Sequence, residues 1–273
     1  MVRSLWSAAS GMIAQQTNVD TIANNLANVN SVGYKTEVAE FKSLLYQELQ
    51  SKTTTANGDN KPISAQVGLG VRNSSITTIF KQGPLLASES DTSFAIEGKG
   101  FFAVRGEDGV TKYTRNGDFR FNTGQGNTLV LSTSNGLPVL DTTGKAISIN
   151  TNQYAANKIT VDATGQLCYP DAQNNPQPMG ITIGMYQFNN PSGLEKTSDT
   201  LYIPTAASGA VMNEATNVNL EKSVIRQGYL EGSGVQVVDE MVNMIVAQRA
   251  YEMNAKAITT TDSMMELANN LKR

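Results

Sequence analysis

The chain has 273 residues, a net charge of −3 and only 16% charged side chains. This length allows two or three packing units, the negative charge argues against a nucleic-acid partner, and the low charged fraction leaves surface that other subunits could bury. Histidine is absent and Cys168 is the only cysteine, so histidine catalysis, His-ligated metals, internal disulfides and cysteine-rich zinc sites are excluded, and no cofactor is expected.

The first predicted element is an amphipathic helix from about residue 4 to residue 32, with Gly33 as its C-terminal stop. Large apolar side chains recur in it every seven residues, at Leu5, Met12, Val19 and Leu26. A period of seven keeps one side of a helix facing a partner helix. The segment carries almost no charge, so we expect it to be buried on more than one side. Its polar interruptions argue against a cleavable signal peptide, and no apolar run is long enough to cross a membrane.

Two more polar stretches follow this helix. Residues 34–49 are more highly charged, and they are expected either to continue the helix or to form an ordered arm. Residues 51–62 contain three threonines together with Asn57, Gly58 and Pro62, a composition typical of a surface loop.

The apolar pattern changes to a period of two from about residue 67, and we predict a β-rich domain over residues 85–205. Within it, residues 96–104 are predicted to form one strand. The strongest turn signal is Asn116–Gly117, because this pair tolerates the positive φ angles of a type I′ turn. We therefore predict a hairpin over residues 113–121.

A second long helix is predicted from residue 233 to about residue 271. Ser233 and Gln236 fit a capping box, and acidic residues in the first turns complement the helix dipole. Apolar side chains again recur every seven residues, at Val237, Met244, Tyr251, Ile258 and Met265, accompanied by Met241, Gln248 and Ala255. The predicted helices at both ends of the chain are therefore expected to pack against other helices.

These elements predict an α+β fold. The long N- and C-terminal helices are expected to pack together as a discontinuous, coiled-coil-like domain around a central β-rich domain. The expected divisions are a helical domain (1–33 plus 235–273), a connecting segment (34–84 plus 206–234) and the β-rich domain (85–205).

Three separate motifs resemble those of bacterial flagellar axial proteins, which build the rod and hook. They are ANNLANVNSVGYK at residues 23–35, IEGKGFF followed by YTRNG at 96–102 and 113–117, and QGYLE followed by QRAYE at 227–231 and 248–252. Residues 4–18 are most similar to the distal-rod branch of this family. The three motifs stand in the order that the family has.

The resemblance implies a structural subunit of the distal rod rather than an enzyme. Such a subunit would polymerise into a hollow helical tube that transmits motor torque to the hook and surrounds the protein-export channel. The terminal helices would form the inner layer and the β-rich domain the outer one. The chain would leave the cytoplasm through the flagellar type III export apparatus, without a cleavable signal peptide, and act in the cell envelope.

The resemblance also implies partners and residues. The partners would be further copies of the chain, proximal rod subunits, hook subunits and outer ring or bushing proteins. The self-assembly residues on the inner helices would be Leu5, Met12, Val19, Ile22, Asn24, Asn25, Leu26, Asn28, Val237, Met241, Met244, Ile245, Gln248, Arg249, Tyr251 and Ile258. A rod-specific stiffening segment would include Leu49, Ser51, Thr54, Asn57 and Pro62.

Two alternatives stay open. The chain could be another axial subunit, from the proximal rod or the hook. It could also be a cell-wall-binding or hydrolytic β-domain anchored by terminal helices, because missing histidine does not exclude catalysis by carboxylates.

Overall fold

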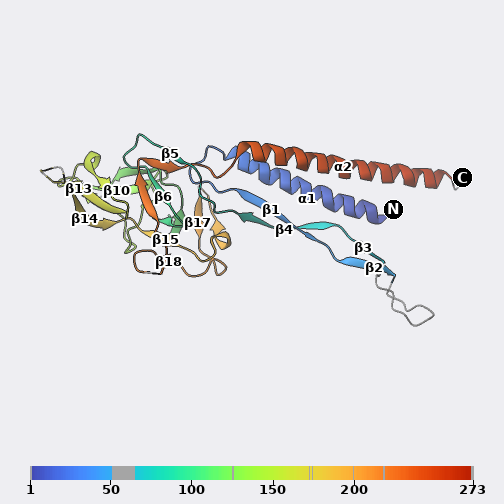
Figure 1. Cartoon of the computed structure of the whole chain (residues 1–273), viewed down its shortest axis with the longest axis horizontal. Helices are drawn as coiled ribbons and strands as arrows, with labels where there is room; N and C mark the ends of the chain where they lie inside the picture. Colours follow the sequence, from blue (N-terminus) through green and yellow to red (C-terminus); the bar gives the residue numbers. More distant parts are fainter. Residues whose placement is uncertain are drawn as a thin grey trace. The chain divides into compact units, whose positions relative to one another are not determined.

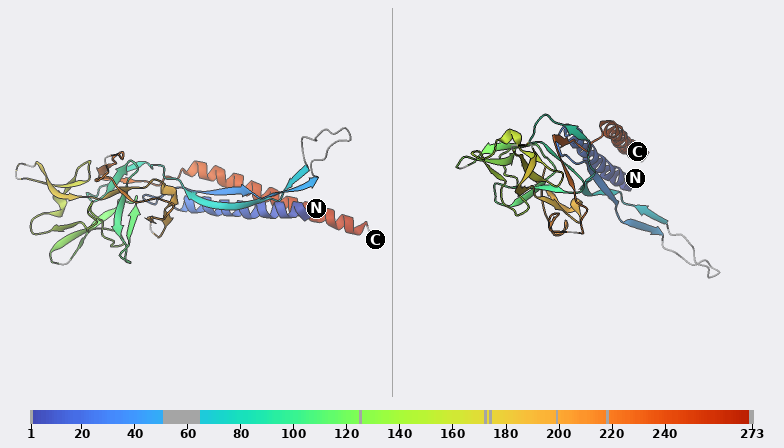
Figure 2. Two further views of the ribbon diagram at one scale, coloured as in Figure 1. Left: turned by 90° about the horizontal axis from the view of Figure 1, so that it is seen from below. Right: turned by 60° about the vertical axis from the view of Figure 1, so that its left-hand side comes forward.

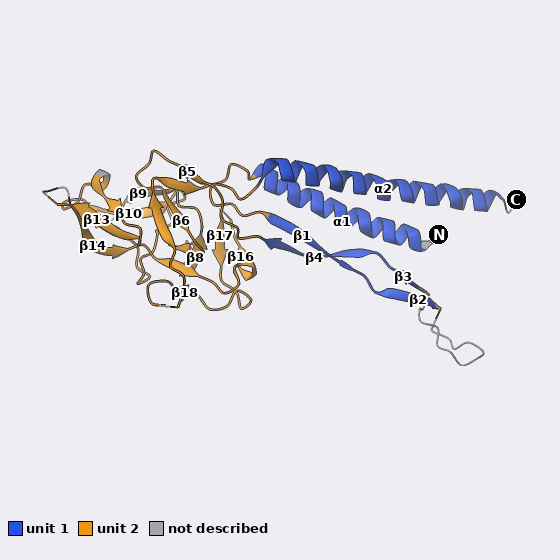
Figure 3. Cartoon of the chain, viewed as in Figure 1, with its two compact units in different colours: residues 1–27, 37–78, 236–273 blue, residues 28–36, 79–235 orange. Residues whose placement is uncertain are grey.

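The computed structural model describes residues 2–50, 65–124, 126–171, 173, 175–198, 200–217 and 219–271. Two compact units make up the chain (Figure 3): unit 1 comprises Met1–Ala27, Glu37–Thr78 and Gln236–Arg273, and unit 2 comprises Asn28–Thr36 and Ile79–Val235. Both long helices belong to unit 1, and most of the strands belong to unit 2. The predicted α+β class, with paired terminal helices and a β-rich centre, is confirmed.

In unit 1 the helices α1 (Val2–Ala27) and α2 (Val237–Asn270) lie side by side and run antiparallel (Figure 1, Figure 2). Small residues allow this close packing. A Cβ placed on Gly11 of α1 would lie only 2.8 Å from the side-chain nitrogen of Asn254 on α2. Ala8 and Ala14 on α1 are also buried. Residues without bulky side chains therefore bring the two helices together.

Both helices are shorter than the sequence pattern predicts. α1 ends at Ala27, because Asn28 accepts a hydrogen bond from the Ser31 hydroxyl (3.1 Å) and stabilises a turn in place of another helical turn. α2 begins at Val237 and its preceding residue makes no side-chain cap. The predicted capping box is wrong, since the Ser233 hydroxyl accepts a hydrogen bond from the amide of Val235 (3.3 Å).

The rest of unit 1, as far as its residues are described, is an antiparallel ribbon that begins at Glu37, so the helix does not continue into residues 34–49 and the ordered-arm alternative is the correct one (Figure 1). Its strands are β1 (Glu37–Ser43) paired with β4 (Val71–Thr78), and β2 (Tyr46–Gln50) paired with β3 (Ala65–Gly68). Two-stranded ribbons are marginally stable alone. α1 supports this one, because Asn73 donates to the Thr17 hydroxyl (2.6 Å) and the Val71 amide to the Ser10 hydroxyl (3.3 Å). The predicted loop at residues 51–62 lies outside the described residues.

Unit 2 is built from short antiparallel strands around a mixed aliphatic and aromatic core. In chain order they are β5 (Leu85–Ala87), β6 (Phe94–Glu97), β7 (Phe101–Arg105), β8 (Thr111–Thr114), β9 (Phe119–Thr123), β10 (Thr128–Thr133), β11 (Ser148–Asn150), β12 (Thr160–Val161), β13 (Gln166–Pro170), β14 (Pro176–Thr182), β15 (Met185–Gln187), β16 (Glu195–Lys196), β17 (Leu201–Ile203), β18 (Met212–Asn213), β19 (Val224–Gln227) and β20 (Tyr229–Glu231). Two short 3₁₀ turns, Ala156–Lys158 and Pro191–Gly193, interrupt them.

The largest sheet of unit 2 has the strand order β16-β17-β8-β7-β15-β18. Three-stranded sheets (β11-β10-β9 and β12-β13-β14) and the pairs β19-β6 and β20-β5 complete the unit. Phe102 on β7 points into one apolar cluster with Phe119, and Phe101, its neighbour, points into another with Tyr202 and Phe188. Alternation along β7 therefore buries both of its faces.

The predicted hairpin at residues 113–121 is wrong. β8 pairs with β7 and β17, whereas β9 pairs with β10. Asn116–Gly117 marks a close backbone approach instead: the Phe94 amide donates to the Gly117 carbonyl (3.0 Å), and a Cβ on Gly117 would overlap the Phe94 carbonyl oxygen. The predicted single strand at 96–104 is likewise two strands, separated at Gly98, whose φ is +132°.

Candidate functional site

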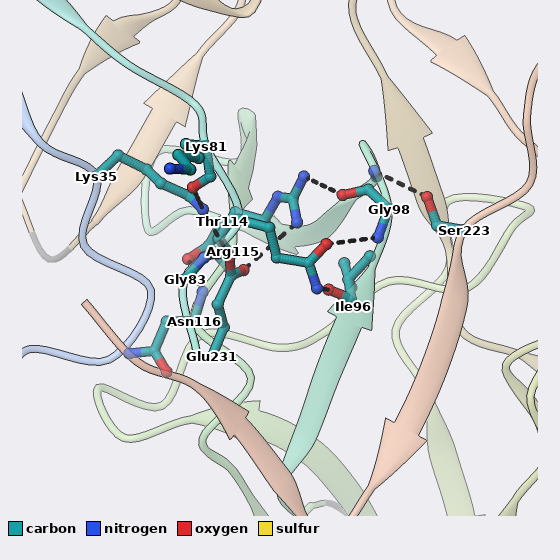
Figure 4. Close-up of polar contacts among 12 residues, drawn as sticks. Lys35, Lys81, Gly83, Ile96, Gly98, Thr114, Arg115, Asn116, Ser223 and Glu231 are labelled. Atoms are coloured by element: carbon teal, nitrogen blue, oxygen red, sulfur yellow. Dashed lines mark hydrogen bonds and ion pairs between the residues drawn. The ribbon is translucent and has the colours of Figure 1, made fainter. Parts of the chain in front are cut away.

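Three charged side chains meet in the interior of unit 2 (Figure 4): Lys35, Arg115 and Glu231. Their side chains are 1%, 3% and 0% exposed. The Lys35 ammonium lies 2.6 Å from one Glu231 carboxylate oxygen, and an Arg115 nitrogen lies 3.4 Å from the other. We call these three residues the buried charge cluster.

Backbone groups complete the coordination of the cluster. Lys35 also donates to the Lys81 carbonyl (2.7 Å), Arg115 donates to the Gly98 carbonyl (2.7 Å), and Glu231 accepts from the Gly83 amide (2.9 Å). Burial lowers the pKa of Lys35 and of Arg115, and the carboxylate of Glu231 opposes both shifts. Glu231 therefore contacts both cations, and Glu214 adds a weaker attraction for Arg115.

Arg115 makes one further contact, and one of its guanidinium nitrogens has no hydrogen-bond partner. Its guanidinium lies over the Phe101 ring, 5.0 Å from the ring centre, which is the geometry of a cation–π interaction. Its Nε is the one buried side-chain nitrogen or oxygen in the described part of the chain that has no hydrogen-bond partner. Loss of Glu231 would thus leave Arg115 poorly compensated.

The buried charge cluster joins the segment that follows α1 to the segment that precedes α2. Within unit 2 these segments also exchange backbone hydrogen bonds, from Gly33 N to Glu231 O (2.8 Å) and from Gly234 N to Tyr34 O (3.0 Å). The segment that follows α1 and the segment that precedes α2 are therefore bonded to each other within unit 2.

A second polar junction lies within unit 1, at Asn25 of α1. Its amide donates to the Glu37 carbonyl (2.8 Å) and to the Glu240 carboxylate (3.4 Å), and its oxygen accepts from the Glu37 amide (2.9 Å). Asn25 thus connects α1 with β1 and α2. Burial raises the pKa of Glu240, and the hydrogen bond from Asn25 opposes that shift. Neighbouring Asn24 donates to the Glu37 carboxylate (3.1 Å).

The residues predicted for self-assembly fall into four sets. Ile22 and Asn25 are buried within unit 1. The half-buried ones are Leu5, Met12, Val19, Leu26, Met244 and Ile258. The exposed ones are Asn24, Val237, Met241, Ile245, Gln248, Arg249 and Tyr251. Asn28 lies beyond α1, in unit 2.

Only one of the five residues predicted for stiffening lies in the described part of the chain. Leu49 lies on β2 and is 54% exposed. Ser51, Thr54, Asn57 and Pro62 lie outside the described residues.

Sequence reasoning missed a second apolar face of α2. Its large side chains are all more than half exposed, and the most exposed within the helix is Val238, at 74%. They are Val238, Val242, Val246, Met253, Met264 and Leu267. Spacings of four, four and seven residues put them on one side of a helix. The sequence signal for this face is the recurrence of valine every four residues, at Val238, Val242 and Val246. The apolar stripe with a period of seven, on the other side of the helix, is the more regular pattern and drew attention away from it.

One hollow of unit 2 contains a buried carboxylate. This hollow of about 400 Å³ is lined by Thr164, Gln166 and Glu214, and the Glu214 carboxylate already accepts three hydrogen bonds. Glu214 accepts from Gln187 Nε2 (2.8 Å), the Ser223 hydroxyl (2.8 Å) and the Ser223 amide (2.7 Å). Across the described ranges, no group of three His, Cys, Asp or Glu side chains could hold a metal ion. Nor does that part of the chain contain a helix long and apolar enough to cross a membrane.

Three family profiles match successive parts of the chain. Residues 5–35 match the profile described as flagella basal body rod protein, residues 95–169 the flagellar hook protein FlgE/F/G D1 domain, and residues 226–271 the flagellar basal body rod FlgEFG protein C-terminal region. Each matched segment supplies one member of the buried charge cluster: Lys35, Arg115 and Glu231 in that order. The motifs are far apart in sequence, and the fold brings one charge from each together.

Curated relatives are similar over the whole length. The flagellar basal-body rod protein FlgG of Borreliella burgdorferi is 42% identical, with both chains fully covered. The FlgG of Agrobacterium fabrum is 40% identical over 99% of this chain and all of the relative, and that of Bacillus subtilis is 36% identical over both full chains. A second Bacillus subtilis protein, the flagellar hook-basal body complex protein FlhP, is 28% identical over the same extent.

Proposed function

We infer the role of this chain from its family: it belongs to the flagellar basal-body rod proteins and is a structural subunit of the distal rod, in the basal body. We propose that its copies polymerise into a hollow helical tube that transmits motor torque to the hook and surrounds the protein-export channel. The observation that carries this proposal is the large apolar surface that α1 and α2 leave uncovered in one copy.

That surface is unusual for a protein that works as a monomer. Trp6 and Ile13 on α1 are 70% and 65% exposed, and α2 exposes Ile245 and Val246 by more than half. Soluble monomers rarely expose long continuous apolar patches, whereas subunit interfaces do so before assembly. The low charge of α1, which carries only Arg3 and Asp20, fits burial among other helices.

We extend the proposal to the surroundings of the subunit. The helices of unit 1 would form the inner layer of the tube and unit 2 the outer one. Residues 49–62 would contribute contacts that stiffen the rod. Proximal rod subunits, hook subunits and ring or bushing proteins would be its neighbours, and the flagellar export apparatus would carry it past the cytoplasmic membrane without cleaving a signal peptide.

A charge placed on the exposed apolar surface of α2 tests polymerisation. We expect Ile245→Asp to raise the concentration needed for sedimentable polymer, because burying an unpaired carboxylate at an interface is costly. Asn243→Asp is the matched control: it adds the same charge to an exposed position on the same helix. Equal effects of the two variants, with unchanged helical content in both, would contradict assembly through this surface.

A further inference from the structure

α1 presents a stripe of exposed residues that points away from its contact with α2. Trp6, Ile13 and Asp20 follow one another at intervals of seven, and all three are exposed. Seven residues are almost two helical turns, so these side chains lie in one line about 21 Å long from Trp6 to Asp20. Two are large and apolar, and the third is acidic. α1 therefore has a second face that is able to pack on another helix.

The exposed apolar face of α2 carries a shallow, open hollow. This hollow of about 460 Å³ is lined by Met253, Lys256, Ala257, Thr260 and Thr261. Four of these, at positions 253, 256, 257 and 260, have the spacing of the hole that receives one side chain in knobs-into-holes packing. A side chain on a neighbouring helix would lie between these four residues.

Placing Ile13 in this hole sets the rest of the register. If the helices run antiparallel, Trp6 falls beside Met264 and Leu267, both exposed and apolar. Asp20 falls beside Arg249, whose side chain is 73% exposed and has a guanidinium nitrogen 2.8 Å from the carboxylate of Glu252 on its own helix. Arginine has five donors, so it can bind a second carboxylate. Apolar side chains thus meet apolar ones, and the acid meets a base.

We propose that α1 of a second copy lies antiparallel on the exposed face of α2, with Ile13 in the hole around Ala257 and Asp20 beside Arg249. This inference rests on the proposed polymerisation and names the contact that drives it. The register resembles that within one copy, where Gly11 meets Asn254, displaced by about one turn. Contact between different faces of identical subunits either closes into a ring or propagates an open helical polymer, and the tube proposed above requires the second.

Cross-linking between two populations tests the register. One carries Ile13→Cys and the other Ala257→Cys, both with Cys168→Ala so that no other thiol remains. We expect disulfide-linked dimers of mixed composition in the sedimented polymer. The control replaces Ala257→Cys by Thr259→Cys, an exposed position on a different side of α2, which should give only background. Circular dichroism verifies that each variant is folded.

The outcomes separate this inference from the proposed function. Polymer without cross-links, or with equal cross-links in both mixtures, would overturn the register and leave polymerisation standing, with another occupant on this face of α2. Absence of any polymer, with or without the new cysteines, would overturn both.

Charge reversal supplies a second test. Asp20→Arg and Arg249→Asp should each raise the concentration for assembly about three- to fivefold, as for an exposed ion pair turned repulsive. A one-to-one mixture of the variants should restore assembly, because each kind of copy then offers its partner an opposite charge. Failure of the mixture to do better than either variant alone would contradict the pairing of Asp20 with Arg249.

Discussion

Lys35, Arg115 and Glu231 show how single residues hold the ends of the chain in place. Ion pairs in the interior are not strong sources of stability, because desolvation offsets much of the attraction. Removal of one partner is a different matter, since it leaves the remaining charges buried without compensation. Here one carboxylate contacts two cations. Loss of Glu231 therefore leaves more buried charge uncompensated than loss of Lys35 or Arg115 would.

We expect Glu231→Gln to lower the free energy of unfolding of unit 2 by about 3–5 kcal/mol, because it strands two buried cations. Urea unfolding followed by near-ultraviolet circular dichroism measures the change. Glu97→Gln is the control: this glutamate pairs with Arg226 at 2.8 Å, but about half of each side chain is exposed, and its loss should cost about 0–1 kcal/mol. Similar costs for the two variants would show that the cluster contributes no more than a surface pair.

Among the elements, the junction of α1, β1 and α2 depends on one buried amide and one buried carboxyl. Asn25 satisfies both backbone groups of Glu37, and it also donates to Glu240. Acidic residues near a helix N-terminus usually complement the dipole in water. Glu240 does so from a buried position, which gives the helix pair a dependence on pH.

Burial raises the pKa of Glu240 above its usual value of 4.5. The folded chain then binds more protons than the unfolded one, so the free energy of unfolding of unit 1 falls as pH rises from the usual pKa through the raised one. We expect Glu240→Gln to remove this fall, since its amide oxygen still accepts from Asn25. Helical circular dichroism during urea unfolding, from about pH 4 to pH 7, measures the difference. Asp262→Asn, at an exposed position further along α2, is the control and should leave the fall in place. Persistence of the fall in the Glu240→Gln variant would contradict this account.

The helices were predictable because helical periodicity is local. Leu5 to Leu26 and Val237 to Met265 carry the pattern within each segment, and the structure pairs both helices as expected. The second face of α2 was less visible, because Val238, Val242 and Val246 belong to a different line of the same helix. A helix with two apolar faces shows no single clear stripe.

The hairpin and the buried charge cluster were not predictable from local pattern. Gly117 is required because the Phe94 carbonyl passes too close for any side chain, a reason that lies elsewhere in the chain. Lys35 and Glu231 are separated by 196 residues and meet only when unit 2 has folded. A lysine after Gly-Tyr and a glutamate before Gly-Ser carry no local sign of burial, although both lie in the motifs that indicate the family.

At the scale of the whole molecule, each unit has its own source of stability. Unit 2 contains the large apolar clusters and the buried charge cluster, whereas the helices of unit 1 expose many large apolar side chains. Residues 28–36 belong to unit 2 although they precede the ribbon of unit 1. Unit 2 should therefore stay folded when both helices are removed, but it should lose stability when these nine residues are removed as well.

We expect a fragment of residues 28–236, which lacks both helices, to keep the cooperative unfolding of unit 2 but to form no polymer. A shorter fragment, 37–236, should be less stable by about 2–4 kcal/mol, because it loses the hydrogen bonds of Lys35 to Glu231 and Lys81 and the two backbone hydrogen bonds made by Gly33 and Tyr34. Trp6, the single tryptophan, is absent from both fragments, so near-ultraviolet signals of the buried tyrosines report unfolding in each. Polymer formed by 28–236 would contradict assembly through the helices. Equal stability of the two fragments would show instead that unit 2 folds without the segment that fastens the end of α1, and that Glu231 is neutralised by Arg115 alone.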